Sequence, residues 1–216
     1  MNNKSKQEFS KKLLEWWKEN KQDFPWRNTK NPYKILVAEM LLRKTTARQV
    51  KKIYSKFIKT YPKASELAKA SEKELETFLK TLGMAKNRSR SLKQLGITLV
   101  EKFGNEVPKS KEKLMSMLGV GRYSANAVLS LAYNKDLPMV DTNAIRVIQR
   151  FFNFKSLKKR LKDDLALWDF TKKLIPKGNG KNFNLAIIDF AHSICTLTKP
   201  KCVNCSIKVN CCYFNQ

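Results

Sequence analysis

The segment Leu114-Met115-Ser116-Met117-Leu118-Gly119-Val120-Gly121-Arg122-Tyr123-Ser124-Ala125 predicts two helices that are joined by a tight Gly-Val-Gly turn. The glycines let backbone amides approach a phosphate without a Cβ in the way, and the second helix begins with the positive end of its dipole beside them. An ordinary helix–helix turn is the alternative. The residues that we expect to contact a phosphate are Leu118, Gly119, Val120, Gly121 and Arg122.

The rest of the chain also shows helical spacing of apolar residues and no convincing strand alternation, which predicts an all-α fold. Ser71-Glu72-Lys73-Glu74 fits a capping box, and Gly83 is placed to end the helix that begins there. The basic run from Lys155 to Lys162 is interpreted as a solvated loop or helix face.

The composition is strongly basic, with 44 Lys and Arg against 18 Asp and Glu and a net charge of +26. Such a charge suits a polyanion, either nucleic acid or an anionic membrane surface, although a lysine-rich solvated surface is the alternative. No stretch is apolar enough to span a membrane, and residues 1–7 lack the apolar run of a signal peptide. We therefore expect an intracellular protein.

All five cysteines lie between residues 195 and 212. The spacing Cys195-x6-Cys202-x2-Cys205-x5-Cys211 predicts a local metal or cluster site, because a secreted disulfide framework would spread its cysteines along the chain. Four thiolates could hold either zinc or an iron–sulfur cluster. Cys212 could replace Cys211 if the register is shifted.

Asp141 lies in Pro138-Met139-Val140-Asp141-Thr142-Asn143, twenty residues after Gly121 and just before an apolar helix. Aspartate is a preferred N-cap residue, so a purely structural role would explain it.

Together these segments resemble the helix-hairpin-helix/GPD superfamily of DNA glycosylases, in the endonuclease III and MutY branch that carries a [4Fe–4S] loop. The likeness runs from Phe24-Pro25-Trp26-Arg27 to the cysteines. It is closest to archaeal-type mismatch thymine glycosylases, on Glu39–Ala47 and Val50–Tyr54. MutY-type adenine glycosylases usually carry paired glutamines where Arg43-Lys44 stand here, and usually a further C-terminal domain.

The resemblance implies roles for three residues in the reaction. Asp141 would stabilise the cationic sugar and position or activate water, and Glu39 would face the base pocket. Tyr123 stands where bifunctional members place the lysine that forms a Schiff base, so the enzyme is expected to be monofunctional. A solvated helix glutamate and a packing aromatic are the alternatives for Glu39 and Tyr123.

The resemblance also implies DNA contacts and a cofactor. Arg43 would fill the hole left by the flipped nucleotide and approach its orphaned partner, and Met84 would act as an apolar wedge. Surface charge and core filling are the alternatives for these two residues. Lys44 would contact DNA, and Lys199 and Lys201 would bind phosphates. The expected ligands of a [4Fe–4S] cluster are Cys195, Cys202, Cys205 and Cys211.

The architecture that the resemblance implies is two helical lobes with the flipped nucleotide between them. A six-helix module would span residues 28–134, and residues 1–27 with 135–216 would form the second lobe, including the cluster loop at 195–212. The expected function is removal of thymine or uracil opposite guanine from double-stranded DNA. The alternatives are adenine removal opposite guanine or 8-oxoguanine, and a non-catalytic iron–sulfur DNA-binding protein. We expect a monomer in a prokaryotic cytoplasm, associated with the nucleoid and not with a membrane.

Overall fold

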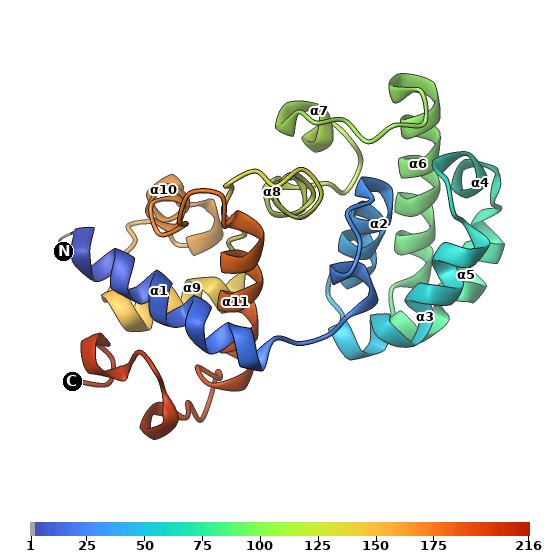
Figure 1. Ribbon diagram of the computed structural model, residues 1–216. Coiled ribbons are helices and arrows are strands. Elements are labelled where there is room, and N and C mark those ends of the chain that lie inside the picture. Colours follow the sequence, from blue (N-terminus) through green and yellow to red (C-terminus); the bar gives the residue numbers. More distant parts are fainter. Residues whose placement is uncertain (1–2) are drawn as a thin grey trace. The chain divides into compact units, whose positions relative to one another are not determined.

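The computed structural model describes residues 3–216, and the regular structure in this range is entirely helical (Figure 1). The prediction of an all-α fold is therefore confirmed. The chain divides into two compact units, residues 23–133 and residues 1–22 with 134–216. We call them the continuous unit and the split unit. In the described range no helix is both long and apolar enough to cross a bilayer.

The continuous unit consists of seven α-helices and two short 3-10 turns. Its elements are η1 (Pro25–Arg27), α2 (Pro32–Leu42), α3 (Ala47–Thr60), α4 (Ala64–Lys69), α5 (Glu72–Leu79), η2 (Lys80–Leu82), α6 (Ala85–Phe103), α7 (Lys111–Met115) and α8 (Arg122–Leu131). Helix α6 is the longest of these and packs against α4 and α5 (Figure 1). Gly96 permits this approach, because a Cβ at this position would lie 2.6 Å from the Ala68 nitrogen.

The predicted capping box is present at the start of α5. The Ser71 hydroxyl accepts a hydrogen bond from the Glu74 amide at 3.1 Å, and the Glu74 carboxylate accepts one from the Ser71 amide at 2.9 Å. The α-helix ends at Leu79, earlier than predicted, because its last turn tightens into the 3-10 turn η2. Gly83 follows with a φ of 71° and ends that turn instead.

The split unit is assembled from both ends of the described chain. Its elements are α1 (Asn3–Asn20), α9 (Thr142–Phe152), η3 (Leu161–Asp163), α10 (Leu165–Lys172), α11 (Gly180–Ser193), η4 (Cys202–Asn204) and η5 (Lys208–Asn210). The basic run from Lys155 to Lys162 forms the loop after α9 and the start of η3, and its lysines are exposed, as predicted.

Helix α1 is held in the split unit by apolar and polar contacts with distant residues. The Phe9 ring lies 4.7 Å from that of Phe151 and 6.4 Å from that of Phe183, measured between centroids. The Trp17 indole donates a hydrogen bond of 2.8 Å to Asp189 on α11, and the Gln22 amide donates a second of 3.1 Å. These contacts satisfy a fully buried carboxylate, which would otherwise destabilise the fold.

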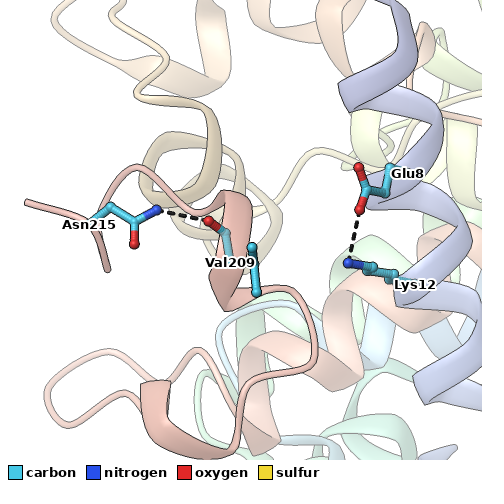
Figure 2. A network of polar contacts seen from close by, with 4 residues as sticks. All are labelled: Glu8, Lys12, Val209 and Asn215. Carbon is cyan, nitrogen blue, oxygen red and sulfur yellow. Dashed lines mark hydrogen bonds and ion pairs between the residues drawn. The ribbon is translucent and has the colours of Figure 1, made fainter.

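The surface where α1 meets the C-terminal tail carries weaker contacts (Figure 2). Lys12 pairs with Glu8 at 2.9 Å one turn apart on α1, and the Asn215 side chain donates to the Val209 carbonyl at 2.9 Å (Figure 2). An exposed ion pair of this kind contributes little to stability, because solvent screens it.

Candidate functional site

The Gly-Val-Gly turn joins α7 to α8, as the sequence predicts. Gly119 has a φ of 83°, in the left-handed region, and Val120 is buried and anchors the turn. A Cβ at residue 119 would lie 2.5 Å from Nη1 of Arg43 and 3.0 Å from Cε of Met40. Glycine is therefore required here by the backbone conformation and by the close approach of the Arg43 side chain.

The start of α8 has the properties of an anion-binding helix terminus. Gly121 is the N-cap and supplies no side-chain acceptor, and the first turn carries no acidic residue. A Cβ at Gly121 would meet no protein atom within 4 Å, so space is open in front of this residue. Leu118 is 52% exposed beside it. This arrangement can bind a phosphate through backbone amides and the positive end of the helix dipole.

Tyr123 and Glu39 belong to the same unit as this turn. Tyr123 is half-buried in the first turn of α8. Glu39 lies in the middle of α2 and is only 5% exposed, which excludes the alternative of a solvated helix glutamate. A carboxyl group held in such surroundings is suited to proton transfer.

Arg43, Lys44 and Met84 come together although about forty residues separate them in the sequence. All three side chains are exposed, and they line one surface hollow with about 440 Å³ of atom-free space. The structure therefore places the two cations and the apolar side chain on one face of the continuous unit.

Asp141 is the N-cap of α9 in the split unit and is half-buried. Its Oδ1 accepts hydrogen bonds from the Asn143 and Ala144 amides, at 3.0 and 2.7 Å, and its Oδ2 accepts one from the Asn143 side chain at 2.8 Å. These three donors fix the orientation of the carboxylate. The N-cap role foreseen as an alternative is thus present, and it leaves Oδ2 with capacity to accept a further bond.

A chain of hydrogen bonds runs from Asp141 to the cysteine loop. Asn143 Nδ2 donates to Asp141, and Asn143 Oδ1 accepts from Arg146 at 3.2 Å. Arg146 also donates to the Cys195 carbonyl at 2.8 Å. One turn further along α9, Arg150 donates to Cys195 Sγ at 3.5 Å and to the Thr196 carbonyl at 2.7 Å. The sequence did not point to Arg146 and Arg150, because cationic residues on an amphipathic helix are expected to be exposed to solvent.

Four of the five cysteines face a single hollow. It has about 380 Å³ of atom-free space, part of it open to solvent, and its lining includes Cys195, Cys202, Cys205 and Cys211 together with apolar side chains. Cys212 instead lines the surface hollow that is also lined by Glu8 and Asn215. The structure therefore brings Cys211, and not Cys212, together with the other three thiols.

The thiols also influence one another electrostatically. Burial raises the pKa of Cys205 to about 11; a hydrogen bond from the Ile207 amide opposes this rise, and charge on the other three thiols adds to it. In residues 3–216 no three His, Cys, Asp or Glu side chains converge on the position of a single metal ion. Four soft sulfur donors around an apolar hollow, with Arg150 donating to one of them, suit an iron–sulfur cluster.

Lys199 and Lys201 lie in the loop between the first two cysteines, and both side chains are exposed. The loop is fixed by hydrogen bonds from the Thr196 hydroxyl to the Lys199 carbonyl at 2.6 Å and from the Lys201 amide to the Ile194 carbonyl at 2.9 Å. Two ammonium groups on a fixed loop can bind phosphates as point charges.

The family model described as "HhH-GPD superfamily base excision DNA repair protein" matches residues 37–173. The chain is similar to the thymine/uracil-DNA glycosylase of Pyrobaculum aerophilum, with 41% identity over 96% of this chain and 92% of that protein. It is 38% identical to the thymine/uracil-DNA glycosylase of Methanothermobacter thermautotrophicus, over 99% of this chain and 96% of the relative.

Among solved structures, a thermostable thymine-DNA glycosylase has a similar fold, with a TM-score of 0.94 and 38% identity. The match covers 99% of this chain and 98% of that one.

Proposed function

The chain belongs to the HhH-GPD superfamily of base excision DNA repair proteins, and we propose that it hydrolyses the N-glycosidic bond of thymine or uracil mispaired with guanine. The resemblance seen in the sequence is thereby confirmed. Near full-length similarity to two thymine/uracil-DNA glycosylases is the observation that carries the proposed substrate. The protein is a hydrolase of N-glycosyl bonds that binds DNA.

Asp141 is the residue that we assign to the departure of the base. Cleavage of the glycosidic bond builds positive charge on the sugar, and a fixed carboxylate compensates that charge. Its Oδ1 is engaged by two backbone amides, so Oδ2 is the atom available to the sugar or to the attacking water. Because the three hydrogen bonds are already formed, the anion needs no reorganisation during the reaction.

Tyr123 determines what happens after the base has left. A phenol cannot form an imine with the sugar, so the abasic strand should remain intact. Glu39, buried on α2, is proposed to donate a proton to the leaving base or to hold water.

The four cysteines that share one hollow are proposed to bind a [4Fe–4S] cluster. Bound there, the cluster would tie η4, η5 and the loop after α11 together and would supply no chemistry to hydrolysis. Arg146 and Arg150 attach this loop to α9, so the loop supports the helix that begins at Asp141.

DNA binding is proposed to use the hairpin amides, Lys199 and Lys201. Each phosphate neutralised by a cation releases counterions, so affinity should fall steeply between low and moderate salt. We further propose a monomer that is associated with chromosomal DNA in the cytoplasm. Sedimentation at several concentrations would test the monomer, and fluorescence microscopy of a tagged protein would test the location.

A panel of labelled duplexes tests the proposed reaction. Each duplex contains one mismatch or damaged base, including G·T, G·U, and adenine opposite guanine or 8-oxoguanine, and products are scored with and without alkali. We expect alkali-dependent cleavage at thymine and uracil opposite guanine. Cleavage only at adenine would favour the MutY-like alternative, and binding without cleavage would favour the non-catalytic one.

A further inference from the structure

Arg88 on α6 is a buried arginine, with 7% of its surface exposed. Its guanidinium donates hydrogen bonds to the carbonyl oxygens of Met40 and Leu41 at 3.0 Å, of Arg43 at 2.8 Å and of Gly83 at 3.4 Å. Within the described part of the chain no acidic side chain pairs with it. Burial and the nearby charge of Arg43 lower its pKa, so the four carbonyl oxygens are what stabilise this cation.

The four acceptors belong to three segments of the backbone. Met40 and Leu41 lie in the last turn of α2, where carbonyl groups have no partner within the helix and where the dipole favours a cation. The carbonyl groups of Arg43 and Gly83 lie in the turn after α2 and in the turn before α6. Arg88 therefore joins the turn at residues 43–44 to the turn at residues 83–84, through a fork that a single ammonium group could not reproduce.

Both turns contain a strained residue. In residues 3–216 the non-glycine residues with positive φ are Lys44, Met84 and three asparagines. Asparagine tolerates the left-handed region, whereas lysine and methionine do not adopt it readily. The φ angles of Lys44, 52°, and Met84, 51°, are therefore unusual for their residue types. Arg88 links the two turns that contain these residues. Strain of this kind persists where the surrounding contacts enforce it, and it clusters at functional sites.

The side chains presented by these turns are exposed. Met84 is an apolar side chain with 52% of its surface exposed, and Arg43 and Lys44 are exposed cations. They line the 440 Å³ hollow described above, whose wall also includes Arg88. An apolar wedge beside cations matches what is needed to enter a base stack next to phosphates.

We infer that Arg88 is a positioning residue for opening the base pair, which holds the two strained turns in one arrangement so that Met84 and Arg43 enter the duplex together. This inference rests on the proposed function, since it assigns a step that precedes base excision. Unstacking a base step costs free energy, and fixing both turns beforehand removes the need to order them during that step.

The test compares two substrates that contain the same thymine. In the first the thymine is opposite guanine, and in the second it is opposite a tetrahydrofuran abasic analogue, where no partner base has to be displaced. Arg88→Lys keeps the charge but loses the fork, so single-turnover excision from G·T should fall about 100-fold. Excision opposite the abasic analogue should fall less than about threefold, since the pre-opened site does not need the wedge.

Three controls separate positioning from folding. Arg90→Lys changes an exposed arginine on the same helix and should leave both rates unchanged. Arg88→Gln is a second variant, which keeps an amide donor. Because no acidic side chain in residues 3–216 pairs with Arg88, removing its charge leaves no carboxylate in that range unpaired. The double variant Arg88→Lys with Met84→Ala should lose less of the G·T excision rate than the product of the two single fold-losses. The reason is that both residues act on the same step.

A spectroscopic readout follows the same step directly. With 2-aminopurine beside the mismatch, binding of wild-type protein should raise the fluorescence, and Arg88→Lys should abolish most of that rise. The inference would be overturned if folded Arg88 variants lost the same fraction of the excision rate on both substrates. It would also be overturned if the fold-losses of Arg88→Lys and Met84→Ala simply multiplied in the double variant. If wild-type protein excises thymine from neither duplex, the proposed function fails instead.

Discussion

Replacing Asp141 with Asn separates the catalytic role of this residue from its capping role. Asn can keep the two backbone bonds to Oδ1, and Asn and Asp are similar N-caps. The new Nδ2 group would face Nδ2 of Asn143, so the 2.8 Å bond is lost unless the Asn143 amide rotates. Rotation would in turn remove the acceptor that Arg146 now uses.

The expected loss of stability is modest. The loss of one charge-assisted bond and of a charge at a helix N-terminus together destabilise the fold by about 1–3 kcal/mol. For a chain of this size that corresponds to a fall in Tm of about 3–10 °C. The catalytic loss is larger. A unit charge about 4 Å from the sugar contributes about 4 kcal/mol at an effective dielectric constant near 20, or about 1000-fold in rate.

Single-turnover excision from a G·U duplex, scored after alkali, measures the rate, and thermal unfolding measures the stability. Asp136→Asn is the matched control, because Asp136 also accepts two backbone amides, from Gly178 at 2.7 Å and Gly180 at 2.9 Å. It should lose similar stability and keep its excision rate. If Asp141→Asn stays within tenfold of the wild-type rate, Asp141 is only a cap and the mechanism is wrong.

Three further predictions concern other parts of the site. Purified Cys211→Ser protein should lack bound iron and the brown absorption near about 400 nm, whereas Cys212→Ser protein should keep both. Equal effects of the two substitutions would contradict the proposed ligand set. Gly119→Ala should lower the free energy of unfolding by about 1–2 kcal/mol and weaken duplex binding, because it strains the turn and displaces Arg43. Fluorescence anisotropy at several salt concentrations measures the binding, and unchanged binding would mean that the turn does not contact phosphates. Tyr123→Lys should add strand cleavage that borohydride traps as a covalent DNA adduct, and a trapped adduct with wild-type protein would refute the monofunctional assignment.

The sequence predicted those features that depend on local patterns. The capping box at Ser71 and the turn at Gly119 follow from short-range backbone chemistry, so each can be recognised within a few residues. The spacing of the cysteines indicated a common site for the same reason. It left the choice between Cys211 and Cys212 open, because adjacent residues differ only in the direction of their side chains.

The features that sequence reasoning missed depend on contacts between distant segments. Arg88 stands among polar residues and looks exposed, and its burial follows from carbonyl groups more than forty residues earlier. The buried carboxylate of Asp189 depends similarly on Trp17, at a separation of 172 residues. No periodicity or motif indicates such pairs, because the sequence separation of the two residues depends on tertiary packing alone.

The order in which the two units can form during synthesis follows from the split between them. Residues 23–133 are contiguous, so the continuous unit can fold as soon as it leaves the ribosome. Helix α1 is made before the continuous unit, yet its partners Phe151, Phe183 and Asp189 are made after it. Until they emerge, Phe9 and Trp17 have nothing to pack against, so the nascent chain passes through a stage with exposed aromatic side chains. A ribosome that stalls before residue 189 should therefore yield a chain that needs chaperone protection.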